Sequence, residues 1–284
     1  MFTHLSDTAK AFIFYGIALA LGLGAALLPG VSTSLYMFTP LVAMLLTMLV
    51  VTRDGYTRAG WARLGLHRPG LRAWPVAVLV PLLVMAVAYA IIWGGGLAWP
   101  VVPADIEGMP VAYLPIIIVV SLVTSTLTVS LGEELGWRGY LLPHLATLGR
   151  WRAALLSGLL HGLWHMPIML LTSLYHPEGE RAVVVPLFLV ALTIAGVFFA
   201  YLRFATDSVW PAALAHSAHN LFWALFSMFT SASSPLIVEY LAGDSGVLIA
   251  AGYALASALL MARLIRRAPQ GQPLRAQPAE GGAR

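Results

Sequence analysis

Long apolar runs recur along this 284-residue chain and restrict its fold more than any other feature. Runs close to the length that crosses a bilayer as an α-helix, about 17–25 residues, lie near 11–28, 35–52, 74–93, 113–132, 153–174, 184–203, 209–230 and 247–265. Strands that alternate polar and apolar residues are absent, and backbone groups in lipid need internal hydrogen-bond partners. The sequence therefore predicts an all-α, polytopic membrane bundle of about eight transmembrane helices.

Composition supports a membrane protein, and the distribution of charge orients it. Only 10% of residues are charged, whereas soluble domains carry about 25%. With the N-terminus placed inside, 15 of the 16 Lys and Arg fall in inner segments, and only Arg181 falls outside. The inner ones are Lys10, Arg53, Arg58, Arg63, Arg68, Arg72, Arg138, Arg150, Arg152, Arg203, Arg263, Arg266, Arg267, Arg275 and Arg284. The positive-inside rule then predicts that both termini are cytoplasmic. We expect the protein to be a multi-pass protein of the cell (plasma) membrane.

The net charge of +4 follows from this topology and from contact with anionic lipid, so no nucleic-acid partner is expected. The absence of cysteine excludes disulfides and thiolate chemistry. We expect a single bundle domain over 1–267, with a motif core at 131–220, followed by a disordered cytoplasmic tail at 268–284. The Arg-rich loop 53–72 could be a solvated loop or a short interfacial helix with Trp61, Leu64 and Leu66 toward lipid.

Two adjacent carboxylates, Glu133 and Glu134, follow a stretch that carries no charge from Val111 to Gly132. Ionisable residues inside a membrane span are costly, and they indicate function by default. Glu134 and Arg138 stand at i, i+4 on one helical face, where such a pair is favourable. This leaves Glu133 without a structural role, as expected for a general base. Arg203 and Asp207, at the inner end of a helix, are interpreted as a topology charge and its neighbour.

Histidines occupy two later helices in similar spacings. His161 and His165 are i, i+4 in HGLWH, which lacks the glutamate of the soluble zincin motif. His216 and Asn220 are i, i+4 in HSAHN, with His219 beside them. We expect one cavity, facing the cytoplasm, to collect Glu133, which would close its helix on the inner side, together with histidines of both motifs.

The ordered motifs E-E-x-x-x-R, H and H-x-x-x-N resemble the CPBP family of intramembrane proteases, which includes type II CAAX prenyl endopeptidases and abortive-infection proteins. The flanking WRGYLLP and HGLWHMP match too, and the resemblance spans 131–220. It assigns catalytic roles to Glu133, Glu134, Arg138, His165, His216 and Asn220. His161 departs from the pattern, because the family usually has an aromatic residue there. We favour a wall role for His161 over an additional hydrogen bond, and a packing role for His219.

The resemblance implies an endopeptidase that cuts a membrane-associated peptide or protein near a membrane-embedded or lipidated C-terminus. Glu133 would activate water, and Asn220 would stabilise the oxyanion. His165 and His216 would hold the water through Zn²⁺, with Glu133 as a third ligand, or would contact the oxyanion directly. We slightly favour the metalloprotease.

Other classes of protein compete with a protease. A serine nucleophile from SLVTSTLTVS or Ser217 is disfavoured, because G-x-S-x-G is absent and small hydroxylated residues commonly pack membrane helices. A transporter would show symmetry between halves, whereas the polar residues cluster in the later helices. Haem ligation has no use for Glu133. A non-catalytic immunity-type scaffold is also open.

Overall fold

The protein is described from a computed structural model that covers residues 5–106, 108–176 and 179–267, so the predicted tail 268–284 lies outside the described residues. It is 78% helical. The α-helices are α1 (Asp7–Ala26), α2 (Thr33–Met37), α3 (Thr39–Leu46), α4 (Arg58–Arg63), α5 (Trp74–Gly94), α6 (Leu114–Ser125), α7 (Leu131–Glu134), α8 (Leu142–Leu145), α9 (Arg150–Trp164), α10 (Met166–Leu171), α11 (Arg181–Thr206), α12 (Trp210–Met228), α13 (Pro235–Ile237) and α14 (Val247–Arg267).

Short 3₁₀ and π segments lie between these helices, together with two short antiparallel strand pairs. The π segments are η1 (Thr47–Val51), η5 (Thr126–Ser130), η6 (Leu135–Leu141) and η8 (Val238–Ala242), and the 3₁₀ segments are η2 (Asp54–Tyr56), η3 (Leu71–Ala73), η4 (Val111–Tyr113) and η7 (Ala146–Leu148). The antiparallel strand pairs join β1 (Ala98–Pro100) to β4 (Thr230–Ala232), with Trp99 opposite Ser231, and β2 (Asp105–Ile106) to β3 (Met109–Pro110).

Seven helical segments in the described part of the chain are long and apolar enough to cross a membrane. They cover Asp7–Ala26, Thr33–Val51, Leu71–Gly94, Val111–Leu148, Arg150–Leu171, Arg181–Thr206 and Pro235–Arg266. The remaining predicted span is present as α12, a 19-residue helix within the bundle. His216, His219 and Asn220 interrupt its apolar character, which explains why α12 is not among the seven apolar segments. The predicted polytopic helical bundle is confirmed.

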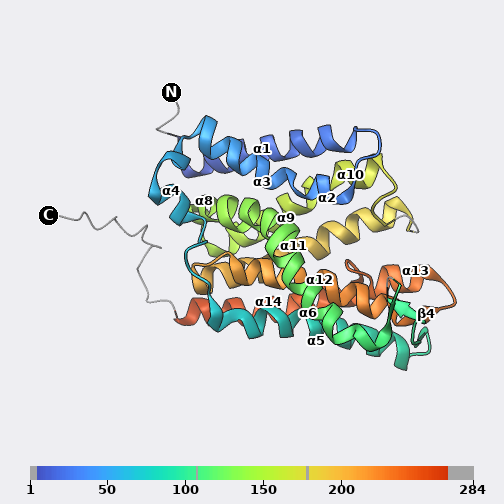
Figure 1. Cartoon of the computed structure of the whole chain (residues 1–284). Coiled ribbons are helices and arrows are strands. Elements are labelled where there is room, and N and C mark those ends of the chain that lie inside the picture. The colour runs from blue at the N-terminus through green and yellow to red at the C-terminus, as the bar shows by residue number, and fades with distance from the viewer. Residues whose placement is uncertain (1–4, 107, 177–178, 268–284) are drawn as a thin grey trace.

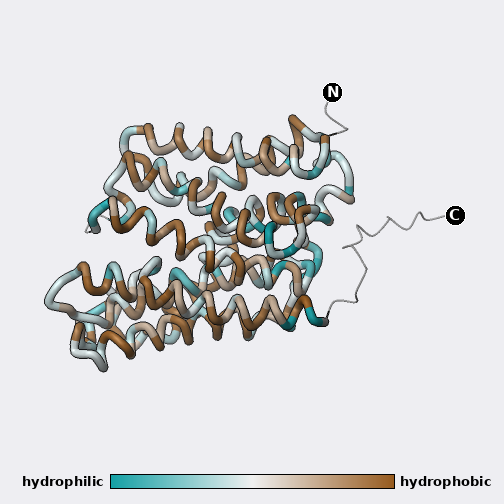
Figure 2. The backbone as a smooth tube through the Cα atoms, turned by 180° about the vertical axis from the view of Figure 1, so that it is seen from behind, coloured by the Kyte–Doolittle hydropathy of each residue, from teal (hydrophilic) through white to brown (hydrophobic). Residues whose placement is uncertain are grey.

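The first and last described helices meet the same end of the bundle. Figure 1 shows α1 beginning, and α14 ending, at the end that also carries α4 and α8. Figure 2 shows hydrophobic residues along the helices and hydrophilic ones mainly toward helix ends and connections. This arrangement agrees with an even number of passes. Which end faces the cytoplasm stays a prediction from the basic residues, which gather at this end.

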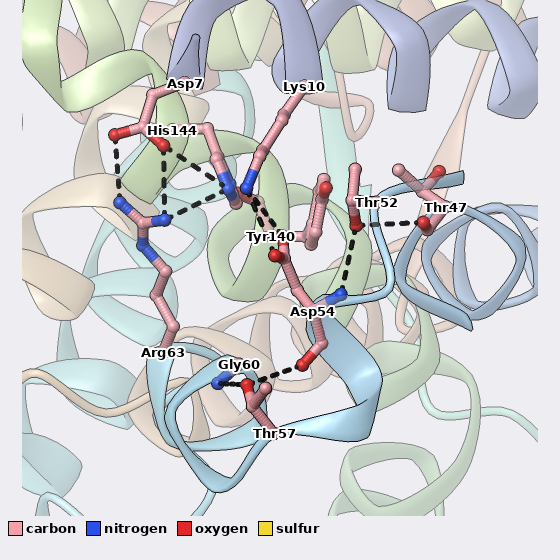
Figure 3. Close-up of polar contacts among 10 residues, drawn as sticks. All are labelled: Asp7, Lys10, Thr47, Thr52, Asp54, Thr57, Gly60, Arg63, Tyr140 and His144. Atoms are coloured by element: carbon pink, nitrogen blue, oxygen red, sulfur yellow. Dashed lines mark hydrogen bonds and ion pairs between the residues drawn. The ribbon is translucent and has the colours of Figure 1, made fainter. Parts of the chain in front are cut away.

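A polar network fastens the basic end (Figure 3). Lys10 pairs with Asp54 at 3.0 Å, and Arg63 pairs with Asp7 at 3.0 Å. The loop 53–72 is therefore folded onto the start of α1. It contains the short helix α4, whose first turn is capped by the Thr57 hydroxyl. Leu64 is only 1% exposed, so the expectation that it faces lipid is wrong; it packs into the core beneath the loop.

Arg203 also belongs to this end and does more than mark topology. Its Nε donates to the carbonyl of Arg138 at 3.1 Å, and its Nη2 donates to the carbonyl of Arg63 at 2.8 Å. Asp207 lies 3.9 Å away. Arg203 thus ties α11 to both η6 and the loop 53–72 and supplies a donor to one carbonyl group of each.

The helix that carries the paired glutamates does not end at them. From Leu114 to Leu145, α6, η5, α7, η6 and α8 follow one another without a break. The expectation that Glu133 closes a helix on the inner side is therefore wrong. Glu133 and Glu134 stand between two π segments, η5 and η6. Such wide turns shift the register of the side chains that follow and often occur at functional sites.

Close helix packing brings α9 against α11 beside these glutamates. A Cβ built on Gly196 would lie 2.5 Å from the Cα of Gly158 and 3.0 Å from Nη2 of Arg138. Only a glycine pair allows this approach, which is typical of membrane helices. It fixes how closely the histidines of α9 can approach the α7–η6 segment.

Candidate active site

The two glutamates of α7 are both buried, and they have different partners. Glu134 accepts a hydrogen bond from Nη1 of Arg138 at 2.9 Å, and neither side chain is exposed. The pair predicted at i, i+4 is therefore present. Glu133, which is 2% exposed, has no cation bonded to it and instead meets the histidine of another helix.

His161 joins the two glutamates to one network. Its Nδ1 lies 3.2 Å from Nη1 of Arg138, and its Nε2 lies 3.0 Å from Oε2 of Glu133. Its ring also stacks on Trp137, with ring centroids 4.8 Å apart and planes 26° apart. The expectation of a wall residue without a hydrogen-bonding role is therefore wrong. The ring is flat against an aromatic neighbour, yet both of its nitrogens are engaged.

The Nδ1 atoms of His165 and His216 face hydrogen-bond acceptors, whereas Nδ1 of His161 faces a donor. Nδ1 of His165 lies 3.1 Å from the carbonyl oxygen of His161, and Nδ1 of His216 lies 3.1 Å from Oε1 of Glu134. Since both partners are acceptors, each Nδ1 carries the proton. In a neutral imidazole this leaves the Nε2 lone pair of each ring available to a ligand.

A cavity of about 180 Å³ collects these groups. Its lining includes Glu133, His161, His165, His216 and Asn220. Glu133, His165, His216 and Asn220, which we expect to converge, therefore all line one cavity. Glu134 and Arg138 are not in its lining; they lie behind it. His219 also lines the cavity and bonds through Nδ1 to the hydroxyl of Tyr253 at 3.0 Å, consistent with a packing role.

The cavity does not face the basic end. Apart from membrane helices, its lining comes from Thr33 and Ser34 at the start of α2, from Tyr175 after α10, and from Asp244 and Ser245 before α14. In Figure 1 these elements lie at the end opposite the start of α1. The two expectations, that the basic end is cytoplasmic and that the cavity faces the cytoplasm, therefore do not hold together in this bundle, and the side that each end faces stays a prediction. Glu133 lies within its helix and not at the end of it. The cavity extends from this mid-bundle position toward the end of the bundle opposite the start of α1.

The residues can be tested for their fit to a metal ion. Ligand atoms of Glu133, His161 and His165 all lie within 4.8 Å of one another. However, a histidine that binds a metal normally donates its other N–H to an acceptor. Nδ1 of His161 instead faces a guanidinium, which can only donate. His165 and His216 do meet this requirement, although His216 is not part of that close group. By this criterion the rings of His165 and His216 are suited to a metal and that of His161 is not, and the zinc set of Glu133, His165 and His216 stays a prediction.

Comparison with known proteins agrees with the motifs. Residues 115–222 match the family model described as type II CAAX prenyl endopeptidase Rce1-like. This segment is similar to Rce1-like proteins, and the match covers less than half of the chain. It contains Glu133, Glu134, Arg138, His165, His216 and Asn220, so the resemblance to the CPBP proteases is supported. No curated protein matches the chain. The Rce1-like match indicates a CAAX-type intramembrane endopeptidase in a multi-pass membrane protein, acting on a membrane-associated substrate.

Two groups within the matched segment 115–222 were not predicted as part of the site. Trp137 is fully buried and shapes the floor under His161. His176, after α10, pairs with Glu239 through Nδ1 and lies 3.5 Å from Asp244 through Nε2. Burial lowers the pKa of His176, but the charges of Asp244 and Glu239 outweigh burial, and the pKa is raised overall. Trp137 belongs to the flanking WRGYLLP, but that segment does not reveal its contact with His161, and His176 belongs to none of the motifs.

Proposed function

We propose that the protein is an intramembrane endopeptidase of the plasma membrane that hydrolyses a peptide bond near a membrane-embedded or lipidated C-terminus. The observation that carries the proposal is the arrangement of Glu133. It is a buried carboxylate without a cationic partner, it lines a cavity inside a membrane bundle, and imidazoles surround it. The similarity of residues 115–222, which include Glu133, to a protease family supports the proposal.

Glu133 acts as the general base in this proposal. A base must reach its proton directly or through one water, and the cavity gives Glu133 room for a water and a peptide carbonyl. The bond from His161 engages Oε2, so the other oxygen serves the water. A low-dielectric surrounding strengthens every electrostatic contact to the developing charge.

The remaining residues bind and polarise. Asn220 lines the same cavity, and its amide can donate to the tetrahedral oxyanion, a contact worth roughly 3–4 kcal/mol in soluble proteases. His165 and His216 present free Nε2 atoms, which would hold Zn²⁺ together with Glu133. When bound, the ion would supply Lewis-acid polarisation of the reacting oxygen. Without it, water activated by Glu133 alone is the remaining route. Glu134 holds His216 in its tautomer, and Arg138 holds Glu134.

The test is Glu133→Gln, which keeps the size of the side chain and removes the base. We expect cleavage of an internally quenched peptide with a farnesylated CAAX C-terminus to fall by at least about 10³-fold in detergent, since the base contributes this much in related chemistry. Thermal unfolding should change little. Cleavage at the wild-type rate by Glu133→Gln would refute the proposed function, and a parallel peptide without the lipid tests whether lipidation is required.

A further inference from the structure

We propose that His161 is the positioning residue for Glu133, locked by Arg138 in the tautomer that carries its proton on Nε2, and that it is not a metal ligand. This inference rests on the proposed function and adds a residue that the protease motifs leave to an aromatic. It assigns distinct tasks to the histidines of the cavity.

The tautomer follows from the partners of the ring. Nη1 of Arg138 lies 3.2 Å from Nδ1 of His161, and a guanidinium has donors only. Nδ1 must therefore accept, so the proton of the neutral ring lies on Nε2. That N–H points at Oε2 of Glu133, 3.0 Å away. The bond fixes one carboxylate oxygen and leaves the other for the reacting water.

The position of the ring is fixed as firmly as its tautomer. His161 is 1% exposed and stacks on Trp137 at 4.8 Å between ring centroids. Its helix, α9, is pressed against α11 at Gly158 and Gly196. Arg138, which selects the tautomer, is itself held by Glu134 at 2.9 Å. A chain of buried contacts therefore runs from Glu134 through Arg138 and His161 to the base.

The other two histidines show what a ligand-ready ring requires. Nδ1 of His165 and Nδ1 of His216 each face an acceptor, so their protons lie on Nδ1. His161 has the reverse arrangement. To bind a metal through Nε2 it would need a proton on Nδ1, directed at the guanidinium of Arg138. The same cavity thus holds two rings that can accept at Nε2 and one that can only donate there.

The first experiment reads the tautomers directly. The full chain, labelled with ¹⁵N-histidine in detergent, is examined by NMR, and His161→Gln identifies the His161 signals. We expect His161 to show the Nε2–H tautomer and His165 the Nδ1–H tautomer. Added Cd²⁺, a probe for zinc sites, should leave the His161 signals unchanged. A His161 ring protonated on Nδ1, or one coupled to cadmium, would overturn the proposal whatever the activity.

The second experiment measures the positioning effect by cleavage of the farnesylated peptide. His161→Phe removes the donor, so kcat should fall by about 10- to 100-fold with KM little changed, as expected when a base loses its orientation. His161→Gln places an amide N–H near the former Nε2 and should restore most of kcat. Wild-type kcat in His161→Phe, or no rescue by His161→Gln although that variant folds, would overturn the proposal.

The controls separate the possible failures. His144→Phe exchanges another buried histidine, outside the cavity, and should keep wild-type kcat. Zinc content should be unchanged in both His161 variants, whereas loss of zinc would make His161 a ligand. An inactive Glu133→Gln together with a fully active His161→Phe would reject this inference and leave the proposed function standing. An active Glu133→Gln would reject the proposed function itself.

Discussion

Two polar networks in this bundle use the same chemical groups in opposite surroundings. At the basic end, Asp7, Arg63 and His144 meet near Lys10 and Asp54 (Figure 3). At mid-bundle, Glu134, Arg138 and His161 meet beside Glu133. The Arg63 and Asp7 side chains are 39% and 29% exposed, whereas those of Arg138 and Glu134 are both 0% exposed.

This difference in exposure indicates a different role for each network. Exposed pairs gain little, because water and salt screen them and long side chains lose entropy. The buried network is costly, since desolvation offsets much of the Coulomb attraction. Within the described residues, Nε and Nη2 of Arg138 and Oε2 of Glu134 have no hydrogen-bond partner. A network tuned for stability alone would satisfy these atoms, which agrees with the proposal that this network orients Glu133 as a base.

The largest expected effect comes from breaking the buried network. Arg138→Ala leaves Glu134 buried without a cation, so we expect a loss of about 3–5 kcal/mol in the free energy of unfolding. Denaturant unfolding in detergent micelles measures it. As a matched control, replacing both partners, Glu134→Leu with Arg138→Met, should recover most of the stability but none of the cleavage activity. Equal destabilisation by the single and double changes would contradict this account.

A smaller effect is expected from His176, which is buried like the mid-bundle network but lies in a connecting segment. Its pKa in the folded state is raised above the ordinary value of 6.5. The ion pairs with Glu239 and Asp244 therefore stabilise the fold fully below that value, and this stability is lost as pH rises through the folded-state pKa. At low pH we expect the free energy of unfolding of the wild type to be larger than that of His176→Gln by about 1.5–3 kcal/mol.

Unfolding temperatures of both proteins, measured from about pH 5.5 to 9, test this dependence. The difference between them should shrink as the pH increases. A difference that is constant, or that grows with pH, would show that the protonated form of His176 does not stabilise the fold.

The smallest effect is expected at the basic end. Asp7→Asn removes the ion pair with Arg63, and because that pair is partly exposed, the cost should be about 0.2–1 kcal/mol and should disappear in high salt. Unfolding in low and high salt measures it, with Ser6→Ala, which removes only the hydroxyl cap of α1, as a control that salt should not affect. A loss above 3 kcal/mol, comparable with that of Arg138→Ala, would erase the contrast between the networks.

Features set by neighbouring residues could be predicted from sequence. The apolar runs predict the helices, and i, i+4 spacing predicts the Glu134–Arg138 pair, because both depend on local geometry. The involvement of His161 could not be predicted, since its bonds to Arg138 and Glu133 cross from α9 to another helix. Continuation of the helix past Glu133 escaped prediction because Gly132, Gly136 and charge together resemble a helix end.

The side from which the cavity is reached depends equally on three-dimensional arrangement. Hydropathy and charge order the loops, but only the packed bundle shows that Thr33, Tyr175 and Asp244 share one cavity with Glu133. These segments are distant in sequence and contain no motif. For the proposed zinc ligands, the residue types indicate which side chains are candidates. Only the hydrogen-bond partners of each Nδ1 in the folded protein distinguish His161 from His165.

The position of the cavity determines from which side of the membrane a substrate would reach Glu133. If the basic end lies in the cytoplasm, as the charge distribution predicts, the opposite end of the bundle, which carries α2, α10 and α13, faces the external medium, and the cavity extends toward that end. A peptide or a membrane-impermeant chelator added to intact cells would then reach Glu133 without crossing the bilayer. The pH and the metal-ion concentration at the cavity would then be those of the external medium and not those of the buffered cytosol.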